Sequence, residues 1–171
     1  TDELVEMNVD PNASNTIDWR FNLAFGQLQS CENRYVNWRA NIIYAANLVQ
    51  HTAGWGYSAG YTYTDFPSHS ASYFDYVYVN ALKELAEVIR QTGPDGVDPD
   101  MTNTYNVARI MYVVTMHRMV DLYGNVPYFE ANRGIEGVFN PVYDDVQEIY
   151  TKEGIDEGGV RGGMLWELWD A

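Results

Sequence analysis

Three histidines are the first candidates for acid–base chemistry in this chain of 171 residues. His51 ends a predicted helix, where a positive charge is favourable, and His69 lies in a predicted loop. His117 lies beside Arg118 in a predicted buried helix, where it can hydrogen-bond within the core. None of the motifs of serine hydrolases, zinc proteases, nucleotide-binding loops or dinucleotide-binding folds accompanies them. The sequence therefore predicts a protein that is not an enzyme and that needs no cofactor.

Carboxylates are the second candidates, because two of them at a defined separation can hydrolyse glycosidic bonds. The chain has 24 acidic residues, and the sequence does not show which of them lie close together. Asp95, Asp98 and Asp100 could attract a cation, but a solvated acidic turn is the interpretation we prefer. The polar alternation from Asn8 to Ser14 lacks the glycine and the distal glutamate of a calcium loop. We therefore predict no metal site.

Aromatic residues are concentrated in an unexpected place, the predicted loop "GWGYSAGYTYTDFPSHS" at residues 54–70. Loops are usually polar, so large rings in a loop need a reason. Trp55, Tyr57, Tyr61 and Tyr63 could stack on a ligand that has apolar faces, such as a sugar or a peptide. They could equally pin the loop to the helices or face a partner protein. The alternation from Tyr61 to Thr64 also fits a short strand.

The overall composition limits the classes of partner. Hydrophobic residues make up 46% of the chain, which is typical of a globular domain, and the formal net charge is -14. Such a charge repels nucleic acids and anionic membrane surfaces, and it favours solubility. The one cysteine, Cys31, cannot form an intrachain disulfide, and we expect it to be a small buried residue. No apolar run is long enough to span a bilayer, and no signal peptide is visible, so we expect a mature, trimmed or internal chain.

Hydrophobic periodicity predicts four or five helices and an all-α fold of stacked helical hairpins. The first is expected at residues 16–31, with Thr16 as its N-cap and an apolar stripe of Ile17, Phe21, Ala24, Phe25 and Leu28. The others are expected at about 34–52, 71–91 and 103–123, and after Pro141. The helix at 103–123 is apolar nearly all round, so we expect it to be the most buried.

The segment "VDLYGNVPYFEANRG", residues 120–134, lies where that helix stops. Gly124 suits the left-handed residue that ends a helix, and Pro127 prevents the helix from restarting. Tyr123 and Tyr128 can fold back over the helix end. Asp121 can bond the backbone, Arg109 or Arg118. The residues thus predict a stop signal with packing behind it, and not a reaction centre.

This segment resembles the SusD/RagB family. The family pattern D-x-Y-G-[DN]-V-P-[YF]-x-E-A is matched from Asp121 to Ala131. The following "NPVYDDVQEIYT" at residues 140–151 and the early "NVDPNA" at residues 8–13 also resemble elements of the family, in the same order. The resemblance covers about residues 4–157.

The resemblance implies a tetratricopeptide-like, SusD-type helical fold without enzymatic activity. Family members are surface lipoproteins of Bacteroidota that capture a glycan, or in some cases a peptide. They deliver it to a SusC/RagA-type TonB-dependent transporter in the outer membrane. The expected location is therefore the extracellular face of the outer membrane, with a lipid anchor on a cysteine that this chain does not contain. The expected ligand-binding residues are Trp55, Tyr57, Tyr61 and Tyr63.

The chain departs from the family in length and in its last residues. Family chains are much longer, so residues 1–157 are expected to be the N-terminal part of an incomplete SusD-like domain. Residues 158–171 form a tail whose continuity with the rest is open, because glycines interrupt the expected helix. We hypothesise that segments are missing between residues 153 and 164. The alternative to nutrient capture is a helical-repeat scaffold that binds a protein and no small ligand.

Overall fold

All of the secondary structure elements in the described part of the chain are helices. The computed structural model describes residues 17–53, 60–64, 67–152 and 162–171. The nearest approach to a sheet within these ranges is an isolated antiparallel bridge between Val126 and Asp144. The prediction of an all-α fold is therefore confirmed.

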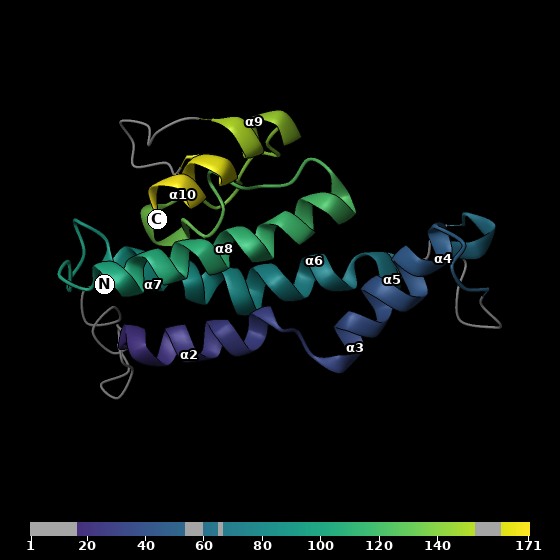
Figure 1. Cartoon of the computed structure of the whole chain (residues 1–171), viewed down its shortest axis with the longest axis horizontal. Coiled ribbons are helices and arrows are strands. Elements are labelled where there is room, and N and C mark those ends of the chain that lie inside the picture. Colours follow the sequence, from purple (N-terminus) through teal and green to yellow (C-terminus); the bar gives the residue numbers. More distant parts are fainter. Residues whose placement is uncertain (1–16, 54–59, 65–66, 153–161) are drawn as a thin grey trace, which may run out of the picture.

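The helices follow one another along the chain with short connections (Figure 1). Their bounds are α2 (Trp19–Ser30), α3 (Arg34–Asn37), the π-helix η1 (Trp38–Ala45), α4 (Ala46–Leu48), the 3-10 helix η2 (Gly60–Thr62), α5 (Pro67–Ser70), α6 (Ser72–Val77), the π-helix η3 (Tyr78–Leu82), α7 (Lys83–Thr92), α8 (Thr102–Tyr123), the 3-10 helix η4 (Gly134–Glu136), α9 (Val146–Thr151) and α10 (Met164–Asp170). The predicted helices at 34–52, 71–91 and 103–123 are each present, the first two with a π-helical stretch inside.

Two parts can be distinguished. The body consists of α2, the long helical run α6–η3–α7, and α8, which pack side by side, with α10 lying on α8 and α9 packed against α10 (Figure 1). The arm consists of α3, η1, α4, η2 and α5, and it projects beyond the end of α2. The body holds most of the core, whose largest fully buried side chains are Tyr73, Tyr112, Tyr128, Leu82, Leu85, Met116, Met119, Ile149, Met164, Val77, Val88 and Val126.

Helix α2 turns its apolar stripe away from the body. Phe21 is 72% exposed and Leu28 is 66% exposed, whereas Asn22 and Gly26 are buried against the body. A Cβ atom at Gly26 would lie 3.0 Å from a methyl carbon of Leu85 on α7, so this small residue permits the close approach of the two helices. The predicted stripe thus exists, but it faces solvent.

The arm also exposes apolar side chains. Tyr35, Ile42 and Val49 recur along it at intervals of seven residues, and each is more than half exposed. A spacing of seven keeps side chains on nearly the same face of a helix. We call Ile17, Phe21, Phe25, Leu28, Tyr35, Ile42 and Val49 the outer stripe.

The start of α2 also differs from the prediction. Its N-cap is Asp18, whose side chain accepts a hydrogen bond from the backbone N–H of Arg20 at 2.8 Å. Carboxylates at this position satisfy a backbone donor that has no partner within the helix. The predicted cap, Thr16, lies outside the described residues.

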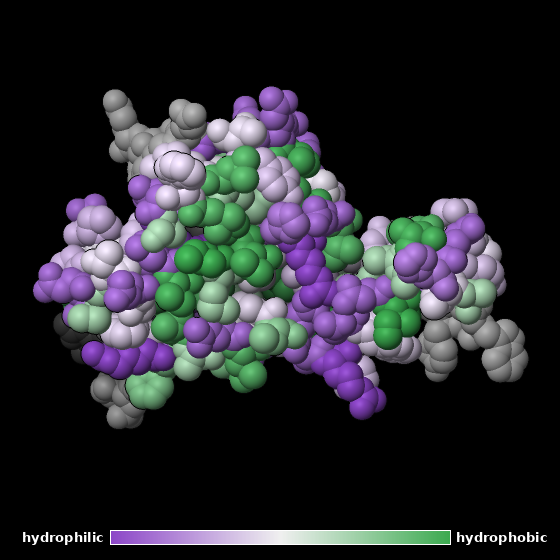
Figure 2. All heavy atoms as spheres, viewed as in Figure 1, coloured by the Kyte–Doolittle hydropathy of each residue, from purple (hydrophilic) through white to green (hydrophobic). Residues whose placement is uncertain are grey.

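Helix α8 contributes a large share of the core but is not buried all round. Met116 and Met119 are fully buried, while Val114 is 63% exposed on the opposite side. His117 was expected in the core, but its side chain is 57% exposed. Figure 2 shows apolar residues gathered in the middle of the face viewed, over α8 and α10.

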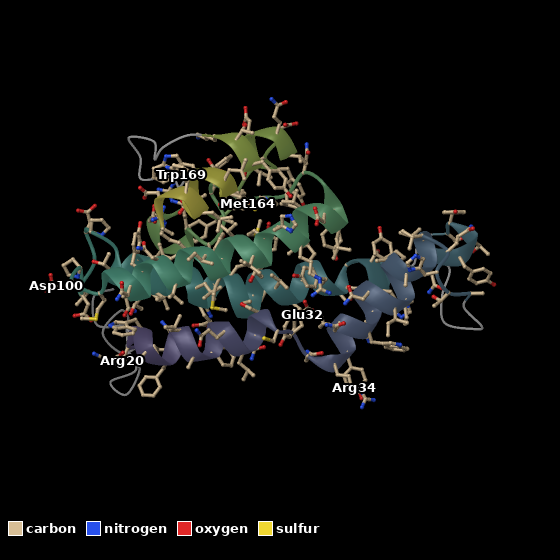
Figure 3. The ribbon with its side chains drawn as sticks, in the orientation of Figure 1. Arg20, Glu32, Arg34, Asp100, Met164 and Trp169 are labelled. Atoms are coloured by element: carbon tan, nitrogen blue, oxygen red, sulfur yellow. The ribbon has the colours of Figure 1, made fainter. Side chains whose placement is uncertain are left out.

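The last helix, α10, was not predicted. Met164 lies at its start, toward α8 (Figure 3), and is buried. Glu167 joins the buried Arg109 of α8 in an ion pair of 2.6 Å. These contacts hold residues 162–171 against the body. The hypothesis of missing segments stays a prediction, because residues 153–161 lie outside the described residues.

Candidate ligand-binding site

Two of the four predicted ligand-binding residues, Tyr61 and Tyr63, belong to the described part of the chain. They lie in or next to η2, at the end of the arm farthest from the body (Figure 1). The segment from Tyr61 to Thr64 was a candidate strand, but its first two residues belong to a 3-10 helix, so that interpretation is wrong. Trp55 and Tyr57 lie outside the described residues.

Both described rings are available to solvent. Tyr61 is 41% exposed and Tyr63 is 67% exposed. Tyr63 has a φ angle of 56°, in the left-handed region that large side chains seldom adopt. Exposed tyrosine rings can stack on an apolar face and hydrogen-bond through their hydroxyls.

A buried asparagine fixes the start of this loop. The side chain of Asn47 donates hydrogen bonds to the backbone carbonyls of Ile42 at 2.9 Å and Ile43 at 2.8 Å. Its oxygen accepts a hydrogen bond from the hydroxyl of Thr52 at 3.0 Å. Asn47 is 3% exposed, so these bonds satisfy a polar group that would otherwise be costly to bury. The aromatic loop therefore leaves a firmly bonded helix end.

Glu32 forms the turn between α2 and the arm, as Figure 3 shows. Its φ angle is 62°, and its side chain is 1% exposed. The carboxylate bonds the guanidinium of Arg118 on α8, which also donates to Asn41 of the arm at 2.7 Å and lies 4.9 Å from the ring centre of Tyr73. We call Glu32, Arg118 and Asn41 the clasp, because Arg118 joins α8 to both the turn and the arm.

Sequence reasoning did not find the clasp. A charged Arg118 within an apolar helix signals that a partner is needed. The partner, however, is 86 residues away along the chain. Burial raises the pKa of the Glu32 carboxyl, although the charge and hydrogen bond of Arg118 oppose the increase. The neighbouring Cys31 is exposed, so the prediction that it is buried is wrong.

The family segment at residues 121–131 closes the end of α8. Gly124 has a φ angle of 75° and ends the helix, as predicted. The hydroxyl of Tyr123 donates to the backbone carbonyl of Ser70 at 2.5 Å, and the hydroxyl of Tyr78 donates to the carbonyl of Pro127. The segment thus ties α8 to the arm and to the α6–η3–α7 run. These contacts are those of a stop signal with packing behind it.

Asp144 holds the same segment from the other side. One of its oxygens accepts hydrogen bonds from the backbone N–H groups of Tyr128 at 2.7 Å and Phe129 at 3.0 Å. Tyr128 is fully buried and Asp144 nearly so. The carboxylate of Asp144 is therefore engaged in holding the backbone of this segment, which is a structural role.

Of the three partners predicted for Asp121, the two arginines, Arg109 and Arg118, are wrong. Its carboxylate lies 3.5 Å from Nδ1 of His117, one helical turn earlier, and near Tyr150. Both arginines have other partners, Glu167 for Arg109 and Glu32 for Arg118. Sequence spacing placed all these groups near one helix, but it could not show on which side of the helix each lies.

The described residues contain neither a cluster of metal ligands nor a helix that could span a membrane. No three His, Cys, Asp or Glu side chains among them lie close enough together to hold a metal ion. None of the described helices combines the length and the apolar character needed to cross a bilayer.

The helices and the exposed rings define a class, an all-α protein of packed helical hairpins with aromatic side chains displayed at one end. Comparison with protein families then identifies it. Residues 11–153 match the SusD-like family described as "Starch-binding associating with outer membrane". The chain belongs to this family, which confirms the resemblance seen in the sequence.

One solved structure that the chain resembles is that of a chitin-binding protein. The two share 32% sequence identity with a TM-score of 0.67, over 78% of this chain and 28% of the other. The chain therefore spans less than a third of that relative. No curated protein matches the chain significantly. Both the family and the solved relative are described by what they bind and not by a reaction.

Proposed function

We propose that the chain is part of a surface lipoprotein that captures a glycan and delivers it to a TonB-dependent transporter. The observation that carries the proposal is the family match over residues 11–153, whose family is described as starch-binding and associated with the outer membrane. The similarity to a chitin-binding protein supports a glycan as the ligand. A peptide remains the other ligand class that exposed tyrosines suit.

The ligand-binding residues in this proposal are Trp55, Tyr57, Tyr61 and Tyr63. The exposure of Tyr61 and Tyr63 at the end of the arm supports their part in it. A sugar ring presents C–H groups on one face, which pack on an aromatic ring, while its hydroxyls stay accessible to polar groups and water. The protein would hold the glycan without changing it.

The remaining parts of the proposal concern location and partner. The protein would lie on the extracellular face of the outer membrane, held by a lipid on a cysteine outside this chain. Its partner would be a SusC/RagA-type transporter. The family description supports association with the outer membrane. Purification of the native protein from detergent-solubilised outer membranes tests the partner, and the expected result is a transporter barrel in equal amount.

Calorimetric titration tests the ligand and the site together. Oligosaccharides of chitin and of starch, and a short unstructured peptide, would be titrated into the full chain. Replacing Tyr63 with alanine is expected to weaken binding of the preferred ligand about tenfold, which corresponds to about 1.4 kcal/mol. Tyr35→Ala is the matched control, because Tyr35 is a similarly exposed ring on α3, a different helix of the arm. The ligand should be recovered unhydrolysed.

The outer stripe favours a second candidate, a helical scaffold that binds a protein and no small ligand. Exposed apolar side chains gathered on neighbouring helices are typical of a protein interface. This candidate predicts that neither glycans nor peptide bind and that Tyr63→Ala has no effect in the titration. A glycan bound with a Tyr63-dependent affinity would reject it.

A further inference from the structure

A cavity of about 490 Å³ lies at the turn between α2 and the arm, and we call it the turn pocket. This volume is within the range of small-molecule sites in proteins. The residues that line it belong to one stretch of chain and include Cys31, Asn33, Arg34, Asn37 and Ile42. All five are exposed, so a ligand can reach them from solvent. The turn pocket lies at the opposite end of the arm from η2 (Figure 1).

Arg34 supplies the positive charge of the turn pocket. Its side chain extends from α3 away from the body, as Figure 3 shows. No carboxylate of the described residues lies within ion-pair distance of it, whereas five other described arginines each pair with one: Arg20, Arg90, Arg109, Arg118 and Arg133. The charge and the donors of the Arg34 guanidinium therefore face solvent without a carboxylate partner.

Asn33 presents donors to the pocket because its acceptor is occupied. Its side-chain oxygen accepts hydrogen bonds from the backbone N–H groups of Tyr35 and Val36, both at 3.0 Å. A backbone N–H can only donate, so the oxygen must lie toward α3 and the NH2 group must point the other way. The NH2 group of Asn33 is therefore left to bind an acceptor of a ligand.

The clasp orients Asn37 in the same sense. The guanidinium of Arg118, which can only donate, bonds the side-chain oxygen of Asn41 at 2.7 Å. The NH2 group of Asn41 consequently donates to the side-chain oxygen of Asn37 at 2.6 Å. The oxygen of Asn37 is thus occupied, and its NH2 group is the part left for another partner.

These three side chains offer donors and no free acceptor, and the surrounding charge agrees with them. Glu32 also lines the pocket, but its side chain is 1% exposed and bonds Arg118. Residues 33–64 contain two arginines and neither Asp nor Glu, in a chain of net charge -14. Exposed charges farther away than about 8 Å are largely screened at physiological salt, so the local charge decides which ligand is attracted. A carboxylate fits, because a guanidinium binds its two oxygens in parallel.

Ile42 gives the pocket an apolar side. It is 53% exposed and lies one to two helical turns after Asn37 along the arm. An apolar side chain next to a set of donors suits a ligand that carries a carboxylate on a ring with C–H groups. A uronic acid unit of a glycan has this combination, since its carboxylate is attached directly to the sugar ring.

We propose that the turn pocket binds the carboxylate of an acidic sugar unit, with Arg34 as the charged donor and Asn33 and Asn37 as neutral donors. The inference rests on the proposed glycan-binding function, and it extends the ligands of the protein to glycans that contain uronic acids. Neutral oligosaccharides lack the group that these donors bind and are not expected in the turn pocket.

The first test compares two ligands that differ only in charge. Trigalacturonate and its methyl ester would be titrated into the unaltered full chain by calorimetry. The ester should bind at least about tenfold more weakly, because it has lost the charge that a guanidinium prefers. The affinity for trigalacturonate should also fall between about 0.05 and 0.5 M salt. Equal affinities for the acid and the ester would overturn the inference.

Variants of the pocket locate the binding. Arg34→Gln should weaken trigalacturonate binding at least about tenfold. Arg20→Gln is the matched control, because Arg20 is an exposed arginine outside the pocket that is paired with Asp18 at 2.8 Å. Unchanged binding by Arg34→Gln would overturn the inference.

Asn37→Asp is a second variant that keeps the fold of the arm. The new carboxylate still accepts the hydrogen bond from Asn41, but it replaces a donor by a charged acceptor and should abolish binding. Asn103→Asp adds the same charge at an exposed position outside the pocket and should bind as the unaltered chain does. Binding that survives Asn37→Asp would contradict the assigned role of Asn37.

The thiol of Cys31 gives a readout that needs no substitution. It is exposed and lines the pocket, so bound trigalacturonate should slow its alkylation by iodoacetamide. The methyl ester at the same concentration should leave the rate unchanged. An alkylation rate that saturating trigalacturonate does not alter would count against the pocket as the place of binding.

The outcomes separate this inference from the proposed function. Neutral oligosaccharides bound in a Tyr63-dependent way, together with no binding of trigalacturonate, would reject the turn pocket and leave the proposed function standing. A glutamate-rich peptide that needs Arg34, with no saccharide bound, would reject the acidic sugar and favour the protein scaffold. Absence of binding by every saccharide would reject the proposed function itself and this inference with it.

Discussion

Asp144 and Asp145 are adjacent carboxylates with different structural roles. Asp144 accepts two backbone hydrogen bonds from the buried Tyr128 and Phe129, whereas Asp145 is the exposed N-cap of α9 and accepts one from Gln147 at 2.8 Å. Asp144→Ala would leave two buried donors without a partner and should cost about 3 kcal/mol of unfolding free energy. Asp145→Ala should cost about 1 kcal/mol. Urea denaturation of both variants measures the difference, and equal costs would contradict the structural role of Asp144.

Glu32 shows that a conspicuous ion pair need not stabilise a fold. Because burial raises the pKa of its carboxyl in the folded state, the contribution of Glu32 to stability is fully present below its unfolded pKa and is lost as the pH rises through the folded pKa. Glu32→Gln should therefore gain stability relative to the unaltered chain as the pH increases from 4 to 8. Denaturation midpoints at several pH values measure this gain. A variant that loses stability relative to the unaltered chain over that range would contradict the sign.

At the scale of elements, helix α2 and its apolar face were predicted correctly, but the face that lies against the body was not. The spacing of Phe21, Phe25 and Leu28 identified a helix and its apolar face. It could not show that the small and polar face, with Asn22 and Gly26, is the one that lies against α7. Close helix packing is decided by the space between two backbones, and that information is not local.

The orientation of α2 can be tested by comparing a residue on its exposed face with a residue of α7 that is buried where the two helices meet. Phe21→Ser should change the unfolding free energy by no more than about 0.5 kcal/mol, because the ring is 72% exposed. Leu85→Ala on α7 should cost about 2 to 5 kcal/mol, because that side chain is fully buried. Thermal and urea unfolding measure both values. A cost of several kcal/mol for Phe21→Ser would mean that α2 packs with its apolar face inward.

Some elements could be predicted from neighbouring residues in the sequence, whereas others depend on residues that are far apart in the chain. Gly124 and Pro127 predict the end of a helix in the sequence, and α8 ends at Tyr123, directly before Gly124. The helix α10 and the clasp depend on pairs such as Arg109 with Glu167, 58 residues apart, which no local pattern reveals. For the candidate site, the sequence singled out Tyr61 and Tyr63, and the structure adds their exposure.

At the scale of the whole molecule, charge and hydrophobic surface are segregated. Residues 17–52 carry three arginines and two carboxylates, a formal charge of +1, whereas the whole chain has a formal charge of -14. These are also the residues that carry the outer stripe. The outer stripe therefore lies in a part of the chain that is not acidic, where charge repulsion opposes contact little.

This segregation predicts that the chain associates through the outer stripe when nothing else covers it. Salt screens the repulsion between acidic molecules, so association should increase between about 0.05 and 0.5 M salt. Light scattering after size-exclusion chromatography measures the mass. The double variant Phe21→Ser with Leu28→Ser should remain monomeric, and Val97→Ser, at another exposed apolar position, should behave as the unaltered chain. A monomer at every salt concentration would contradict the prediction.

The exposed thiol of Cys31 has a practical consequence. It is the one cysteine of the chain, and it stands next to Glu32, at the turn between body and arm. A maleimide fluorophore would therefore attach at a single known position without any mutation. Because that position lies beside the clasp, the emission of the dye should respond when the arm changes its angle to the body, and ligand-induced motion could be followed in real time in the natural sequence.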